Sequence, residues 1–244
     1  MTEFPLPGGI GVSHLRAYEW EAEDGVCGGS PHVHLACTEA YVVTGGKGAA
    51  HTLSVGGGYR ETPLEAGSIV WFSPGTVHRM VQRGDLRVTV LMQNSGLPEA
   101  GDAVFTFPPE VLADPAAYAE AAALPSPGTD DAARRRRDLA VRGYLRLKDA
   151  FDDGDTGPLR EFHRAAAALV APKIADWVPK WRAGALAAAE LTGDHLKALA
   201  NGDASHLAAS GVREAIPSRR DGYGMCGRRE EYGIPGVTLP YGGE

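Results

Sequence analysis

Four side chains that can bind a metal ion place the strongest constraint on how this chain can fold. His32, His34 and Glu39 lie close together, and His78 follows much later in the sequence. On a β-strand, side chains at positions i and i+2 point to the same face, so His32 and His34 share one. Three imidazoles and one carboxylate suit a divalent metal such as Fe(II), Mn, Ni, Co, Cu or Zn. The spacing predicts one metal site inside a small β-barrel, provided that the strands face a common interior.

Glu39 and His78 each open a strand-like run. Glu39 begins the run 39–44, in which Tyr41 and Val43 should share its face. His78 follows a Ser-Pro-Gly turn and begins the run 78–82. Both side chains are therefore expected at strand starts, where they can converge with the two earlier histidines.

The first group of ligands lies in a motif that resembles the first motif of the cupin superfamily. That motif reads Gly, five residues, His-x-His, three or four residues, Glu, six residues, Gly. The chain supplies His32, His34, Glu39 and then Gly46. The leading glycine of the motif is out of register, and two glycines lie on either side of its place: Gly25 and Gly28.

The second cupin motif reads Gly, five residues, Pro-x-Gly, two residues, His, three residues, Asn. The chain is similar from Gly67 to Gln82 and carries His78 at the ligand position. Ser73 replaces the first proline of the family's usual turn, and Gln82 replaces its asparagine. Both departures lie at turn and strand positions and leave the ligands intact.

The resemblance covers roughly residues 8–95 and implies both a fold and a cofactor. The implied fold class is mainly β with α: a cupin-type double-stranded β-helix, or jelly-roll, barrel followed by a mostly helical C-terminal region. The implied cofactor is one divalent metal ion of unknown identity. The ligands that the resemblance implies are His32, His34, Glu39 and His78.

Composition divides the chain into a barrel domain over 1–98, a Pro/Ala-rich connector over 99–129 and a helical extension over 130–244. The expected strands are 10–22, 32–35, 39–44, 49–55, 68–72, 77–82 and 86–93, with glycine turns at 45–48, 56–58 and 83–85. The expected helices are 109–123, 131–151, 158–170, 184–202 and 205–210, with a turn or a kink at Pro179. The Gly/Pro-rich tail from Arg219 is expected to be irregular.

The charge balance excludes a nucleic-acid partner and gives no sign of a membrane. The formal net charge is −7, and both halves of the chain are mildly acidic. No apolar run approaches the length of a membrane span, and no secretory signal opens the chain. Three cysteines form no even disulfide framework. A reducing cytoplasm is the expected location.

Glu39 and Tyr41 are the candidate catalytic residues. Glu39 could bind the metal and also act as a base, and the hydroxyl of Tyr41 could donate a hydrogen bond to a substrate oxygen. A packed wall residue is an equal alternative for Tyr41. The predicted substrate pocket consists of Tyr41, His51, Trp71, Met80 and Met92. The arginine- and glycine-containing segment 221–229 is expected to be a structural loop over the barrel or against a dimer partner; the alternative is an arginine-lined lid for an anionic substrate.

Two classes of function remain open. The first is a metal-dependent cupin enzyme that acts on a small polar molecule, with non-haem iron-type dioxygenase or sugar-type isomerase chemistry. The alternative is a non-catalytic cupin that binds a sugar or acts as a regulatory module. A homodimer is expected because barrels of this type often pair through exposed sheet edges.

Overall fold

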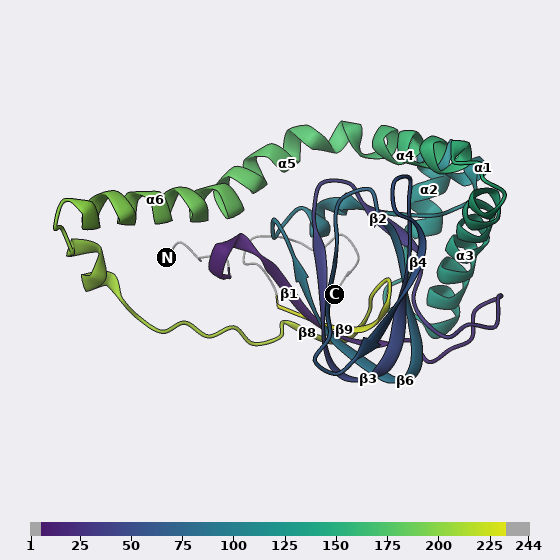
Figure 1. The fold of residues 1–244 in the computed structure, drawn as a ribbon, viewed down its shortest axis with the longest axis horizontal. Helices are drawn as coiled ribbons and strands as arrows, with labels where there is room; N and C mark the ends of the chain where they lie inside the picture. Colours follow the sequence, from purple (N-terminus) through teal and green to yellow (C-terminus); the bar gives the residue numbers. More distant parts are fainter. Residues whose placement is uncertain (1–5, 233–244) are drawn as a thin grey trace.

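A computed structural model describes residues 6–232, and within them nine strands form one continuous antiparallel sheet folded into a barrel (Figure 1). The strands are β1 (Gly11–Ala17), β2 (His32–His34), β3 (Glu39–Ser54), β4 (Gly58–Glu65), β5 (Ile69–Phe72), β6 (Val77–Met92), β7 (Ala103–Phe105), β8 (Arg219–Tyr223) and β9 (Gly227–Glu231).

Two long strands, β3 and β6, pair with each other along almost their whole length and connect two layers. The first half of β3 pairs with β5 and its second half with β4. Likewise, β6 pairs with β2 near its start and with β1 near its end. One layer therefore runs β5–β3–β6–β1–β9–β8, and the other β4–β3–β6–β2–β7. This pairing is that of a double-stranded β-helix, and it confirms the predicted fold class.

Two glycine segments that we expected to be turns, 45–48 and 83–85, are bends within β3 and β6. The register between the strands shifts there in several steps, which marks β-bulges. A Cβ atom at Gly48 would lie 2.1 Å from the carbonyl oxygen of Val81, so only glycine allows the strands to approach this closely. The prediction was wrong because glycine is required here by the close contact between two strands and not by a reversal of the chain.

Strand β4 was not predicted at all. Most of its residues are exposed or half-buried, and among the described strands it pairs only with β3, at one edge of the sheet. Its sequence contains Pro63 and several charged residues, so it lacks the apolar alternation on which strand prediction depends. Pro63 is compatible with an edge strand, where one backbone N–H is not needed for pairing.

The helices lie on one side of the barrel and along its top in Figure 1. They are α1 (Pro109–Leu112), α2 (Pro115–Ala122), α3 (Asp130–Asp152), α4 (Gly157–Val170), α5 (Ile174–Trp181) and α6 (Ala187–Ala200). Short 3₁₀ or π turns η3 (Ala171–Lys173) and η4 (Arg182–Leu186) join α4, α5 and α6. Three more such turns lie elsewhere: η1 (Pro7–Gly9) before β1, η2 (Pro98–Asp102) between β6 and β7, and η5 (Ser205–Ala209) between α6 and β8.

The expected helices 131–151, 158–170 and 184–202 are present with small shifts at their ends, whereas 109–123 is divided into α1 and α2 and 205–210 is the 3₁₀ turn η5. Helix α3 begins after Thr129, whose side chain accepts a hydrogen bond from the N–H of Ala132 at 3.2 Å. Pro179 lies inside α5, and the π-helical η4 follows directly, so the proline leads into an irregular segment without ending the helical path. No helix within residues 6–232 is long and apolar enough to cross a membrane.

The tail that we expected to be irregular forms a β-hairpin over residues 219–231. Strand β9 pairs with β1, and β8 pairs with β9, so the hairpin extends one layer of the barrel. The backbone of the turn is held by the N–H of Ser30, which donates to the carbonyl of Met225 at 2.9 Å. Residues 233–244 of the predicted tail lie outside the described residues.

Candidate metal centre

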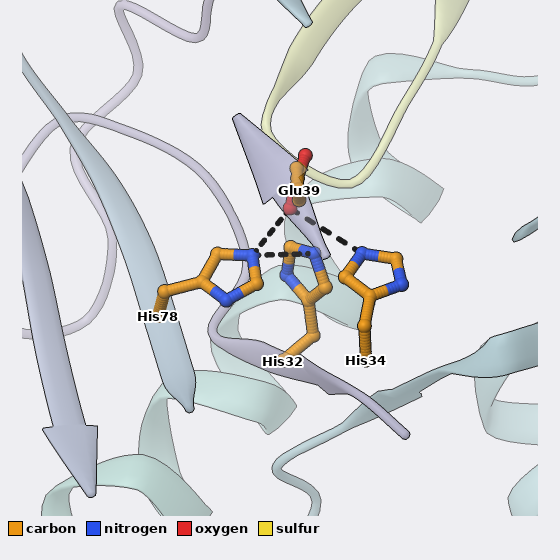
Figure 2. A group of neighbouring side chains, drawn as sticks. All are labelled: His32, His34, Glu39 and His78. Atoms are coloured by element: carbon orange, nitrogen blue, oxygen red, sulfur yellow. Dashed lines mark hydrogen bonds and ion pairs between the residues drawn. The ribbon is translucent and has the colours of Figure 1, made fainter. Parts of the chain in front are cut away.

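The four predicted ligands meet between the two layers of the barrel. His32 of β2 and His78 of β6 are directly paired across their strands, and His34 lies two residues further along β2. Glu39 comes from the other layer, at the start of β3. One ligand atom from each residue lies within 4.8 Å of the others, and all four residues are buried. Figure 2 shows the three rings directed toward the carboxylate of Glu39.

Backbone carbonyls fix the orientation of two of the imidazoles. The Nδ1 atoms of His32 and His78 lie 2.9 and 3.0 Å from the carbonyl oxygens of Ser30 and Thr76. A carbonyl oxygen only accepts, so each Nδ1 carries the proton, and each neutral ring keeps a lone pair on Nε2. The two Nε2 atoms are 3.1 Å apart. Two lone pairs at this distance repel each other unless a cation or a proton lies between them.

A buried carboxylate orients the third imidazole. Asp102, at the end of η2, accepts from Nδ1 of His34 at 3.0 Å, and its other oxygen accepts from the N–H groups of Leu35 and Ala36. Asp102 has no solvent exposure. A carboxylate behind a metal-binding histidine fixes the tautomer and makes the other nitrogen a better ligand. Asp102 therefore directs Nε2 of His34 into the cluster.

The carboxylate of Glu39 completes the set of acceptors. Its Oε2 lies 2.8 Å from Nε2 of His78 and 3.3 Å from Nε2 of His34. This oxygen is enclosed and has no hydrogen bond of acceptable geometry within residues 6–232. Leaving a buried carboxylate oxygen unsatisfied costs free energy, and a bound cation would remove that cost. The donor set therefore fits one divalent metal ion, held by three nitrogens and one oxygen.

The surroundings shift the pKa values of the ligands in different directions. Burial, reinforced by the neighbouring histidines, holds the pKa of His32 well below its usual value. Burial also acts to lower the pKa of His34, but the hydrogen bond to Asp102 and the nearby carboxylate of Glu39 outweigh it and raise the pKa to about 9. Burial opposes ionisation of Glu39, yet the neighbouring imidazoles of His78 and His34 keep its pKa well below the usual range.

Two helices of the C-terminal half brace the segments that carry the ligands. Nε2 of His163 on α4 donates to the carbonyl of Gly75 at 2.9 Å, in the turn just before His78. The indole N–H of Trp177 on α5 donates at 3.3 Å to the carbonyl of Ala100, which lies within η2, the segment that ends at Asp102. The helical half thus contacts the structural supports of two ligands.

A cavity of about 120 Å³ opens beside the cluster and is lined by His32, His34 and Glu39. Apolar side chains form part of its wall, and charged side chains from α3 and the β8–β9 hairpin form another part. In Figure 2 the yellow ribbon of this hairpin passes close to Glu39. The cluster is therefore buried from bulk solvent but adjoins a space that can hold a small molecule.

The predicted pocket residues take different positions. Met92 lines the cavity. Tyr41 and Met80 are fully buried in the core and are not among the lining residues; the ring of Tyr41 packs edge-on against Phe72. His51 is partly buried and pairs with a glutamate on β4, and Trp71 is 69% exposed. The roles proposed for these residues in substrate binding stay predictions.

Sequence reasoning missed several residues of this site, because they lie outside both motifs. Asp102 follows the barrel motifs without a pattern of its own. Arg219, Arg229 and Glu231 lie more than a hundred residues further on, in the hairpin that was expected to be irregular. The only signal in the sequence was the arginine content of the segment 221–229, which supported the less favoured reading of an arginine-lined lid.

Comparisons with known proteins give no match to any family model and none to a curated protein. Several solved structures resemble part of the chain. CapF, a capsular polysaccharide assembling protein of Staphylococcus aureus, is 20% identical over 33% of this chain and 22% of its own length, with a TM-score of 0.27. The CENP-C cupin domain of Drosophila melanogaster is 16% identical over 34% of this chain and 58% of its own, with a TM-score of 0.27.

A third structure is the TDP-quinovose 3,4-ketoisomerase WlaRB of Campylobacter jejuni, 13% identical over 34% of this chain and 60% of its own length, with a TM-score of 0.29. The chain thus spans less than two thirds of each of these three structures. Strand pairing and ligand geometry, and not these matches, carry the assignment of the fold and the metal site.

Replacing His78 by alanine tests the ligand set. We expect the metal content of purified protein to fall sharply in His78→Ala, while the barrel still folds, because one of four converging donors is lost. His14→Ala is the matched control, since His14 is exposed on β1. Elemental analysis and circular dichroism measure the two effects. Unchanged metal content in His78→Ala would remove this residue from the site.

The raised pKa of His34 predicts how metal affinity depends on pH. Below pH 9 a metal ion must displace a proton from His34, so affinity should rise about tenfold per pH unit from pH 7 until it levels off near pH 9. Asp102→Asn removes the charge that raises this pKa, so it should flatten the slope and weaken Zn²⁺ binding by about 10- to 100-fold near its optimum.

Competition with a colorimetric zinc chelator across this pH range measures both effects of Asp102→Asn. The exposed Asp131→Asn on α3 serves as the matched control and should behave as the unmodified chain does. An unchanged slope and affinity in Asp102→Asn would show that Asp102 does not act on the metal through His34.

Proposed function

We propose that this cupin-fold chain is an enzyme that uses one divalent metal ion to act on a small polar molecule. The observation that carries the proposal is the convergence of four metal-binding atoms beside a cavity. A purely structural metal site is closed on all sides, whereas a catalytic site keeps a position open to substrate. Here the three residues His32, His34 and Glu39 both contribute ligand atoms and line the cavity.

A divalent metal bound here would polarise a substrate oxygen, or, if redox-active, would supply electron transfer. The residues of the chain have complementary tasks. The rings and Glu39 fix where a substrate oxygen can approach, and the enclosing barrel limits access of water. Non-haem iron-type oxygenation and sugar-type isomerisation both remain within this proposal.

Glu39 and Tyr41 are the proposed catalytic residues. Burial raises the pKa of Tyr41 well above its usual value, so its hydroxyl keeps its proton at neutral pH and can donate a hydrogen bond. That hydroxyl lies 3.8 Å from Sγ of Cys226, a residue that lines the cavity. Cys226 thus lies between the hydroxyl of Tyr41 and the cavity.

Metal loading followed by turnover assays tests the proposal. Freshly purified protein should contain a transition metal by elemental analysis. The chain reconstituted with Fe(II) should consume O₂ with an enol, a diketone or a catechol, or a reconstituted form should interconvert aldose and ketose sugars by NMR. His78→Ala should lose the activity together with the metal. Full metal occupancy without turnover on this panel would contradict oxygenation and isomerisation of these compounds and would favour a binding module.

The homodimer is also a proposal, and α6 is the surface that we propose for it. None of the 14 residues of α6 is buried, and Leu191, Leu196 and Leu199 are each about half exposed or more. Figure 1 shows α6 extending away from the barrel. A helix of this length is marginal in water without a packed face. A second copy of the chain would provide that face.

Light scattering after gel filtration tests the dimer. We expect a mass of about twice 25.7 kDa for the unmodified chain, because a second α6 would cover the leucines. The double variant Leu196→Glu, Leu199→Glu should be monomeric. The control is Ile69→Glu, Trp71→Glu, which changes two exposed apolar residues on the barrel strand β5. Loss of the dimer only in the β5 variant would move the interface to the sheet edge.

A further inference from the structure

A second group of charged side chains lines the cavity that contains the metal ligands. Arg219 of β8 and Arg229 and Glu231 of β9 lie there together with Arg136 of α3 and Glu99 of η2. These residues lie far from the ligand motifs in the sequence and come together only because the C-terminal hairpin returns to the barrel. Their charges and partners determine which molecules the cavity favours.

Arg219 is the cation in this group that the protein leaves available. Within the part of the chain that the structure describes, Arg219 forms no hydrogen bond and no ion pair, whereas its neighbour Arg220 pairs with Glu230 at 3.2 Å. The register of β8 against β9 shifts between Arg219 and Gly222, so a bulge turns this part of the strand. A Cβ atom at Gly222 would lie 3.1 Å from Nε of Arg219, so the glycine leaves room for the guanidinium.

The other two arginines are engaged by the protein. Arg136 is buried and donates to the carbonyls of Ala122 and Gly224, so it holds the hairpin turn against α3. Arg229 donates to Oε1 of Glu231 at 2.6 Å. These contacts position the hairpin at the cavity and leave Arg219 as the guanidinium that can bind a ligand.

Glu231 offers a complementary acceptor. It is buried, and its Oε2 has no hydrogen-bond partner within residues 6–232, although Oε1 accepts from Arg229. An enclosed carboxylate oxygen of this kind is stabilised by a hydroxyl that donates to it. The cavity therefore presents both a cation for an anionic group and an acceptor for a hydroxyl group.

The charge of the loaded cavity favours an anion. The arginines and glutamates in its lining are equal in number, so their formal charges cancel. A divalent ion would then leave a net charge of about +2, which Asp102 behind His34 reduces to about +1. A small volume and apolar walls that include Leu15, Val90 and Met92 restrict the carbon skeleton of a ligand to a small one.

The geometry points to a small hydroxylated organic acid as the substrate class, with its carboxylate bound by Arg219 and a hydroxyl donated to Glu231. This inference adds a substrate class to the proposed function. It rests on that function because the bound metal ion supplies part of the positive charge in the cavity. It does not depend on whether the reaction is an oxygenation or an isomerisation. A neutral sugar would leave both Arg219 and the net positive charge unmatched.

Calorimetric titration of the full-length, Zn²⁺-loaded chain tests the inference with lactate as the probe. Lactamide has nearly the same shape without the charge, and inorganic phosphate reports a preference for phosphate over carboxylate. We expect lactate to bind at least about tenfold more tightly than lactamide, because a hydrogen bond to a charged partner is lost with the amide. Lactate should also bind more tightly than phosphate.

Arg219→Gln should weaken lactate binding by about tenfold or more and should leave lactamide binding unchanged. Arg220→Gln is the matched control, because Arg220 lies next to it on β8 and pairs with Glu230 outside the cavity lining. It should bind lactate as the unmodified chain does. Circular dichroism of both variants confirms that each is folded before titration.

The inference is overturned if loaded protein fails to bind lactate, binds lactamide equally well, prefers phosphate, or is unaffected by Arg219→Gln. Elemental analysis of the same samples separates this result from the proposed function. Protein that retains metal but does not favour lactate loses only the substrate class. Protein that never retains metal, yet binds lactate through Arg219, loses the metal-dependent function and keeps the anion site.

Discussion

The rest of the structure depends on the mutual approach of four buried side-chain atoms that can each bind a metal ion. Ser30, Thr76 and Asp102 hold the Nδ1 side of the three rings, so in their neutral forms the rings direct lone pairs at one another and at Glu39. Such an arrangement raises the free energy of the metal-free fold. The free energy of binding a cation would offset this cost, as in other sites where metal binding is coupled to folding.

The two long strands make this convergence possible. Because β3 and β6 bend through both layers, Glu39 at one end of β3 faces histidines that belong to the opposite layer. The bend needs glycine at Gly46 and Gly48, where added Cβ atoms would lie within about 2 Å of backbone oxygens of the partner strand. The residues that shape the barrel are therefore as necessary to the site as the residues that bind in it.

The resemblance to two cupin motifs predicted the barrel and the complete ligand set, and short-range periodicity predicted which neighbouring side chains share a face. Side chains two residues apart share a face, and this rule alone aligned His32 with His34 and Glu39 with Tyr41. The same rule could not place Asp102 or Arg219, because their positions depend on how distant segments pack. The glycines of β3 and β6 were wrongly predicted to form turns. Glycine is favoured both in tight turns and where two backbones approach closely, so the sequence alone does not distinguish the two cases.

The helical half is best understood through the contacts that it makes behind the ligands. His163 and Trp177 bind carbonyls next to the segments that carry His78 and Asp102, and Arg136 holds the hairpin turn at the cavity. Each of these bonds fixes a backbone segment and none contacts the cluster itself. Ligands held by rigid supports lose less freedom on binding a metal or a substrate. The chain beyond the barrel therefore contributes to the site by restricting the motion of its parts. It also returns a strand pair that carries Arg219, whose guanidinium has no partner within residues 6–232.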